Sequence, residues 1–232
     1  MDIAYSLLFF FEIIAFIFSI YYFKRIKTRE SLYFMLFLGF TVFIEMLGFY
    51  PRYLDDFAFL AKLKGTVFER NFWLYNIWFL ISFLFYTSYF KWNLSTKKTK
   101  YYLTITSWLY LVIGVFVLIF YDFFFYKYSP FTLVTGTLMV FSSVSLYYFE
   151  LLMSDKLLTL KRSLSFYVSI GVLIFYICFT PIFIFSVFLE ESNPEFIAIY
   201  TILLIVGNYI LYSSFIVGFL VCSKKKVKLK LL

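Results

Sequence analysis

Two glutamates lie well inside long apolar segments, away from the segment ends. Glu12 lies within residues 3–23, and Glu45 lies within residues 31–50. An ionised side chain at the centre of a bilayer costs about 2.5–3.5 kcal/mol or more, so such residues usually face the interior of a helix bundle. Each carboxyl group could therefore bind a ligand, an ion or a proton, or could simply hold helices together.

Three further polar residues are expected at related depths. Counting about 1.5 Å per residue from the segment ends, Glu45, Thr180 and Glu12 lie about 9, 12 and 14 Å beneath the same predicted surface. Asn76 is expected at the depth of Glu45, and Asn208 near the midplane. These five residues form the predicted outward-facing polar cavity. The alternative is tight helix packing, in which Glu45 bonds to Asn76, to Tyr75 or to an outer arginine.

The composition excludes several classes of reaction and cofactor. The chain has no histidine, which excludes Ser–His and Cys–His nucleophile pairs and histidine metal sites. Cys178 and Cys222 are expected near opposite membrane faces, too far apart for a disulfide, and two thiols alone do not form a standard zinc site. No lysine in residues 196–222 could carry a retinal Schiff base, and no aspartate lies within an apolar segment. We therefore expect a non-enzymatic protein without a cofactor or metal.

The elements that must position these residues are long apolar helices. Apolar residues make up 63% of the 232 positions, whereas soluble domains average about half. A helix of about 20 apolar residues is long enough to cross the hydrocarbon layer. The sequence predicts an all-α, polytopic seven-helix bundle as a single domain over residues 1–222, followed by a basic tail over residues 223–232. The predicted membrane spans are residues 3–23, 31–50, 72–90, 101–121, 131–151, 164–188 and 196–222.

Charge predicts the orientation of these spans. Sixteen of the 21 lysines and arginines lie in residues 24–29, 91–100, 156–162 and 223–232, on one side of the predicted membrane. The positive-inside rule places this side in the cytoplasm, with the N-terminus outside and the C-terminus inside. The first span lacks a basic leader and a cleavage site and is expected to remain as an anchor. The net charge of +8 then indicates attraction to a lipid bilayer rather than to nucleic acid.

Polar residues at helical spacing predict which faces of the spans point inward. Thr41, Glu45, Gly48 and Arg52 share one face of the second span. The fifth span has a corresponding polar row, which consists of Thr135, Ser142 and Ser145.

The fourth span contains the apolar run LVIGVFVLIF (111–120) and is expected to be the most lipid-exposed. Phenylalanines within the spans are expected to face lipid for the most part, and residues 51–71 to include a helix on the membrane surface.

Charged residues on the basic side form a possible contact surface for a cytoplasmic protein. Glu150 and Asp155 lie among lysines and an arginine at the end of the fifth span, where ordinary ion pairing is the simpler explanation. Docking of a partner is the alternative. The residues of this predicted surface are Glu150, Asp155, Lys156, Lys224, Lys225 and Lys226.

In four stretches, at residues 44–50, 71–78, 147–185 and 207–219, the chain resembles a family of small, uncharacterised seven-helix integral membrane proteins common in Bacteroidetes. The most specific is the E-x-x-x-S-D-K element at residues 150–156 with the proline that follows it, Pro181, within YYFELLMSDKLLTLKRSLSFYVSIGVLIFYICFTPIFIF (147–185). The others are IEMLGFY (44–50), NFWLYNIW (71–78) and GNYILYSSFIVGF (207–219). The resemblance implies this fold in a bacterial inner membrane, and an association with sensor kinases. It transfers no catalytic or ligand residues.

These observations favour a sensory or signal-transmitting membrane module with an outward-facing polar cavity. Its partner would be a cytoplasmic signalling protein or a second copy of the chain. Two alternatives stay open at this point. One is an ion channel or small-solute transporter, such as an oligomeric pore used in defence, and the other is an accessory subunit that anchors a larger complex.

Overall fold

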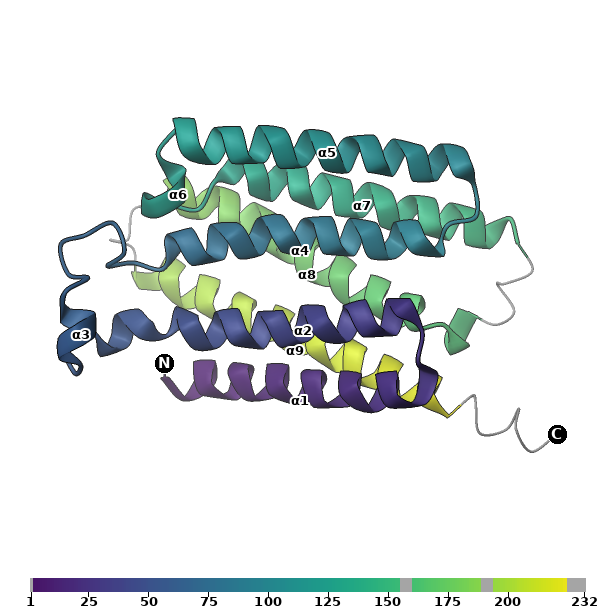
Figure 1. Ribbon diagram of the computed structural model, residues 1–232, viewed down its shortest axis with the longest axis horizontal. Coiled ribbons are helices and arrows are strands. Elements are labelled where there is room, and N and C mark those ends of the chain that lie inside the picture. The colour runs from purple at the N-terminus through teal and green to yellow at the C-terminus, as the bar shows by residue number, and fades with distance from the viewer. Residues whose placement is uncertain (1, 155–159, 189–193, 225–232) are drawn as a thin grey trace.

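Long helices make up most of the protein. The computed structural model describes residues 2–154, 160–188 and 194–224, and within these ranges seven helices have 20 or more residues and no strand occurs (Figure 1). The long helices are α1 (Asp2–Ile26), α2 (Arg29–Gly48), α4 (Phe72–Asn93), α5 (Lys97–Phe120), α7 (Pro130–Leu152), α8 (Leu164–Phe188) and α9 (Pro194–Ser223). The short elements are η1 (Tyr50–Tyr53), α3 (Ala58–Ala61) and α6 (Phe123–Tyr126).

Within the described residues, five helical segments are long and apolar enough to cross a membrane. They are Leu7–Ile26, Arg29–Tyr53, Lys97–Phe120, Pro130–Leu152 and Thr201–Ser223. Helix α4 has 22 residues, but its tyrosine, tryptophan and asparagine side chains make it less apolar. In α8, the apolar stretch with described side chains runs over Leu164–Thr180. The protein is therefore an all-helical membrane protein.

Short turns with local caps set where two of these helices begin. Thr28 precedes α2: its hydroxyl accepts from the Ser31 amide at 3.3 Å, while the Ser31 hydroxyl accepts from the Thr28 amide at 3.1 Å. This reciprocal pair satisfies amide groups that have no partner inside the helix. Ser129 caps α7 in a similar way, with Pro130 at the first helical position. The short turn at residues 27–28 places α1 and α2 side by side.

Six of the long helices form a closed ring. Helix α1 packs on α2, α2 on α4, α4 on α7, α7 on α8, α8 on α9, and α9 returns to α1. Helix α5 lies outside this ring and packs on α4 and α7. In Figure 1, α8 and α9 run at a slant to the other helices, and α1 begins at the opposite end of the bundle from the end of α9. The first and last helices of the chain are thus neighbours.

The interior of the bundle is built largely from aromatic rings. Phe34 on α2 is wholly buried and makes edge contacts with Phe85, Tyr89, Phe215 and Phe219 at centroid distances of 5.2–5.6 Å. Such edge-to-face geometry is favourable for aromatic pairs. The prediction that phenylalanines face lipid for the most part has six fully buried exceptions: Phe34, Phe83, Phe90, Phe179, Phe215 and Phe219.

The polar row predicted for the inward face of α7 points away from the core. Thr135 donates to the Phe131 carbonyl at 2.6 Å, and Ser142 donates to the Leu138 carbonyl at 2.8 Å, so both hydroxyls are satisfied by their own helix. Ser145 is exposed. A hydroxyl that bonds four residues back needs no neighbouring helix, and its polarity therefore does not mark an inward face.

Two other expectations about exposed segments have different outcomes. Helix α5 presents a broad apolar surface, with Trp108, Val112 and Ile119 each more than 60% exposed, as expected for the helix that faces lipid most. Residues 51–71 do not form one surface helix. They contain η1 and the single-turn helix α3, followed by turns that continue to Arg70.

Candidate functional site

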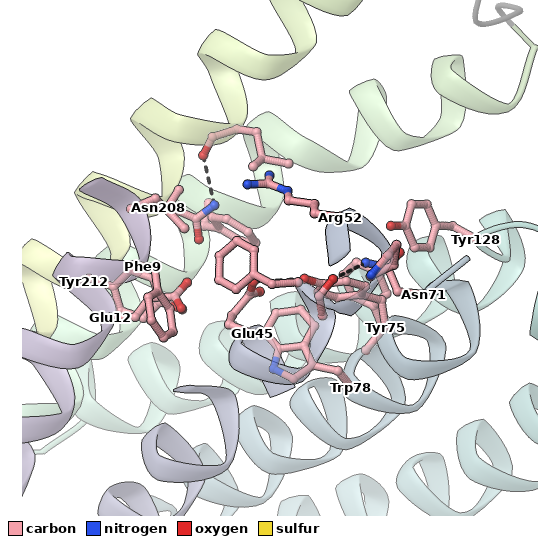
Figure 2. Close-up of a pocket in the computed structure, with 17 residues that line it drawn as sticks. Phe9, Glu12, Glu45, Arg52, Asn71, Tyr75, Trp78, Tyr128, Asn208 and Tyr212 are labelled. Carbon is pink, nitrogen blue, oxygen red and sulfur yellow. Dashed lines mark hydrogen bonds between the residues drawn. The ribbon is translucent and has the colours of Figure 1, made fainter. Parts of the chain in front are cut away.

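A cavity of about 460 Å³ lies among five of the ring helices, α1, α2, α4, α8 and α9. Three of the five predicted cavity residues line it: Glu12, Glu45 and Asn208. It reaches one end of the bundle at Pro51, Arg52 and Asn71, the end that the sequence predicts to be outside. Figure 2 shows side chains around it from α1 and α9, near the two ends of the sequence, and from α2 and α4. The region around the two glutamates is therefore hollow.

Glu12 is almost completely buried. It is 2% exposed, and its carboxyl group interacts with the Tyr212 hydroxyl of α9. Its second oxygen, Oε2, has no hydrogen-bond partner in the part of the chain that the structure describes. A buried carboxyl oxygen without a donor is unfavourable, and such groups in native proteins call for an explanation. Glu12 therefore offers an unused acceptor to whatever occupies the cavity.

Glu45 bonds to a neighbouring helix and faces the same cavity. The Tyr75 hydroxyl of α4 donates to Glu45 Oε2 at 2.9 Å. Gly48, one turn further along α2, makes room for this ring, because a Cβ atom there would lie 2.5 Å from Tyr75 Oη. Trp78 Nε1 donates to Thr41 Oγ1 at 3.3 Å on the same pair of helices. The predicted face of α2 is thus the face that packs on α4 and lines the cavity.

Arg52 and Asn71 stand where the cavity reaches the end of the bundle. The Asn71 amide donates to the Gly48 carbonyl at 2.7 Å, which ties the start of α4 to the end of α2. The guanidinium carbon of Arg52 lies 5.0 Å from the centroid of the Phe49 ring. Among the described residues of the lining, Glu12, Glu45 and Arg52 are the charged ones.

Asn76 does not line the cavity. Its side-chain amide donates to three backbone carbonyls, Phe123 at 3.1 Å, Phe124 at 3.1 Å and Lys127 at 2.9 Å. These bonds hold the α6 turn against α4. Consecutive residues of a helix point about 100° apart, so Tyr75 and Asn76 face different neighbours although their depths are nearly equal. The predicted depth therefore could not show that Tyr75 lines the cavity and Asn76 does not.

Thr180 also lies apart from the cavity lining. Its hydroxyl donates to Thr137 Oγ1 at 2.9 Å and to the Tyr176 carbonyl at 2.7 Å, which connects α8 to α7. Asn208 does line the cavity, and its amide donates to the Leu204 carbonyl of its own helix at 2.9 Å. The predicted set therefore divides into cavity residues and residues that join helices.

Several lining residues were not singled out by sequence reasoning. Phe9, Trp78, Tyr128 and Phe175 supply aromatic walls. Two of them could have been found from helical spacing: Phe9 precedes Glu12 by three residues, and Trp78 follows Tyr75 by three, so each pair shares a face. Tyr128 precedes α7 in the chain, and no periodic pattern marks it.

At the opposite end of the bundle, Glu150 on α7 bonds to the turn that leads into α5. Its carboxylate accepts from the amides of Ser95 at 2.5 Å and Thr96 at 3.1 Å, and from the Thr99 hydroxyl at 2.9 Å. A carboxylate at a helix N-terminus satisfies free amides and interacts favourably with the helix dipole. These bonds assign Glu150 a local structural role, where the sequence suggested ion pairing or docking.

The other predicted cytoplasmic contacts are only partly described. Lys224 is exposed directly after the last turn of α9. Asp155, Lys156, Lys225 and Lys226 lie outside the described residues. Cys178 is exposed, whereas Cys222 is buried and its thiol donates to the Arg162 carbonyl at 3.4 Å. Among the residues described, no group of three or more histidine, cysteine, aspartate or glutamate side chains could hold a metal ion.

Replacing Glu150 with alanine should lower the free energy of unfolding by about 1 kcal/mol, because two amides and one hydroxyl lose a charged acceptor while water can reach them. Unfolding in mixed micelles would measure this change. Glu30 provides the matched control, since it is exposed in the first turn of α2. Its replacement with alanine should have less than half the effect, and equal effects would contradict the capping role.

No protein-family model, curated protein or solved structure matches the chain.

Proposed function

We propose that the chain is a non-enzymatic seven-helix protein of the bacterial inner membrane that binds a ligand in the cavity and transmits its occupancy to the cytoplasmic end. In this arrangement α4 and α8 also cross the membrane, the N-terminus is outside and the C-terminus inside. Support comes from the described connections and helix ends at residues 24–29, 91–100 and 160–163, which lie together at the end of the bundle where α9 ends (Figure 1). These are the basic connections, as the positive-inside rule requires.

The observation that carries the proposal is a pair of carboxyl groups that face one cavity, Glu12 buried and Glu45 half-buried. Two glutamates used only to join helices would be expected to have their oxygens satisfied by neighbouring helices. Instead, Glu12 Oε2 remains without a partner among the described residues, and about 460 Å³ of space adjoins it. Small-molecule sites are typically cavities of about 300–1,000 Å³ with a few polar groups on apolar walls.

Helix pairs provide the route by which occupancy would reach the other end. Glu12 and Tyr212 join α1 to α9, and Glu45 and Tyr75 join α2 to α4. A ligand that competes for either carboxylate would favour a different arrangement of these helices, provided that it binds the two arrangements with different affinity. Helix α9 leads directly from the cavity to Lys224 and the basic tail. A cytoplasmic signalling protein of the kind implied by the family resemblance would detect the change there.

Cysteine labelling in whole cells tests both the cavity and its orientation. In a background with Cys178 and Cys222 replaced by alanine, Asn208→Cys should react with a membrane-impermeant cationic thiol reagent added outside. Ser143→Cys is the matched control, because Ser143 is wholly buried away from the cavity. Absence of labelling at Asn208 in a folded protein would contradict an outward-facing cavity.

Transmission is tested at the opposite end of the same helix. In the same background, the double variant Glu12→Gln/Glu45→Gln should change the labelling rate of Lys224→Cys by an internally applied reagent at least threefold. Glu30→Gln should leave that rate unchanged. An unchanged rate in the double variant would indicate that the two carboxyl groups only hold helices together.

The arrangement also bears on the channel alternative. Phe34, Phe215 and Phe219 are wholly buried in the half of the bundle between the cavity and the basic end. A water-filled path would have to displace these rings. We therefore expect liposomes that contain the purified protein to show no ion flux above protein-free liposomes, and sustained flux would favour the channel.

A further inference from the structure

We infer that the ligand of this cavity is a small organic ammonium ion with an apolar body. The inference rests on the proposed function and specifies the ligand class of the same site. It follows from the acceptors that face the cavity, from its walls and from its size. Each of these observations concerns residues shown in Figure 2 or in the lining of the cavity.

Among the described residues at the buried end of the cavity, one carboxyl oxygen lacks a donor and the two ionisable carboxyl groups have no cation beside them. Glu12 Oε2 is without a partner in the described chain, and the two carboxyl groups are close enough to interact electrostatically. Like charges in such a position disfavour each other, and a cation placed between them relieves that repulsion. An ammonium group supplies the charge and up to three N–H donors, whereas a neutral alcohol supplies one donor and no charge.

The cavity walls suit an organic cation better than a metal ion. Phe9, Trp78, Tyr128 and Phe175 contribute aromatic rings to the lining. Aromatic faces attract ammonium groups, most strongly where water is excluded. Hard metal ions instead require several oxygen ligands at short distance. A cavity of about 460 Å³ is also much larger than a bare ion, and leaves room for an organic body beside the charged head.

Arg52 determines which way such a ligand lies. Arg52 is the positively charged residue of the lining, and it stands at the end of the bundle, with its guanidinium group against the Phe49 ring. It repels the charged head and leaves the carboxyl pair as the favourable place for it. The ammonium group would therefore lie between Glu12 and Glu45, and the apolar body would extend toward Phe49 and Arg52.

Calorimetric titration of the full-length protein in nanodiscs tests the ligand class. The probes are methylammonium, tetramethylammonium, butylammonium and 2-phenylethylammonium, with 2-phenylethanol and 3-phenylpropionate as the neutral and anionic counterparts, and with sodium and calcium chloride. We expect 2-phenylethylammonium to bind saturably, and at least tenfold more tightly than either counterpart.

Single variants connect that binding to the residues of the cavity. Glu12→Gln and Glu45→Gln should each weaken 2-phenylethylammonium binding at least tenfold, and Glu30→Gln should not change it. If a glutamate variant fails to fold, Trp78→Leu compared with Trp78→Phe keeps the test decisive. The leucine variant should lose most of the affinity and the phenylalanine variant should retain it.

Several results would overturn the inference. They are binding of no ammonium probe, equal binding of the neutral or anionic counterpart, and saturable binding of sodium or calcium alone. Each of these would leave the proposed function standing, provided that Asn208→Cys is labelled from outside. Failure of that labelling would instead remove the proposed function, whichever compound binds in nanodiscs.

Discussion

Replacing Phe34 with alanine is expected to lower the free energy of unfolding by about 2–3 kcal/mol. Burial of a phenylalanine in a soluble core is worth about 3–5 kcal/mol on this substitution, part of which is transfer from water. In a membrane the unfolded helix exposes the same ring to lipid, so most of that transfer contribution is absent. The lost packing remains, because Phe34 contacts Phe85, Tyr89, Phe215 and Phe219 at the centre of the bundle.

The comparison that isolates this effect is Phe116→Ala. Phe116 lies on α5 and is 51% exposed, whereas Phe34 is wholly buried. The Phe116 variant should lose less than about 0.5 kcal/mol, since lipid fills the space that the ring leaves. Steric-trapping measurements in bicelles give both values directly. Equal losses would mean that Phe34 does not pack within the bundle.

Replacing Gly136 with alanine is expected to destabilise the contact between α4 and α7. A Cβ atom at this position would lie 2.4 Å from Cδ2 and 2.5 Å from Cγ of Phe83, a ring that is itself wholly buried. Overpacking of a closed interior costs about 1–3 kcal/mol, and the higher helix propensity of alanine offsets up to about 1 kcal/mol of that. A net loss of about 1–2 kcal/mol should follow.

Gly114→Ala separates the clash from the change in helix propensity. A Cβ atom there would meet Leu80 Cδ2 at 3.0 Å, which is the far end of a flexible side chain, and Thr132 Cγ2 at 3.5 Å. The leucine can move by a few tenths of an ångström, so the net change should be within about 0.5 kcal/mol. The same bicelle measurement applies. A Gly136 variant as stable as the Gly114 variant would contradict the close contact with Phe83.

The positions of the long helices could be predicted because each apolar segment is bounded by charged or turn-forming residues. The second predicted span, residues 31–50, corresponds to α2 at Arg29–Gly48, and the third, residues 72–90, to α4 at Phe72–Asn93. Length and hydropathy set these limits directly, since crossing a membrane requires about 20 apolar residues. This prediction needs only the local sequence of each segment and no knowledge of contacts between segments.

Which side chains face the interior was harder to predict. Lipid and the core of the bundle are both apolar, so hydropathy does not distinguish buried Phe34 from exposed Phe116. Polarity is a useful marker only where the side chain needs a partner on another helix. The hydroxyls of Thr135 and Ser142 have partners on their own helix, and these residues were consequently assigned to the wrong face.

Part of the candidate site could be predicted from the sequence, because some of its polar side chains need partners on other helices. Glu45 has no partner on its own helix to satisfy it, and Tyr75 was among its expected partners, as the structure has it. Tyr212 could be assigned to an inward face but not to Glu12, since α1 and α9 are separated by almost the whole chain. Asn76 was wrongly predicted to line the cavity. Its partners are backbone carbonyls at the short helix α6, and no pattern of side chains in the sequence indicates them.

The adjacency of α1 and α9 has a consequence for how the protein is made. Glu12 leaves the ribosome 200 residues before Tyr212, the residue whose hydroxyl interacts with it. The ring of helices cannot close, and the cavity cannot acquire its final wall, until the C-terminal helix has entered the membrane. Until α9 has been synthesised, the carboxyl group of Glu12 lacks the Tyr212 hydroxyl beside it. A chain truncated before α9 would lack this wall of the site as well as the contact that closes the bundle.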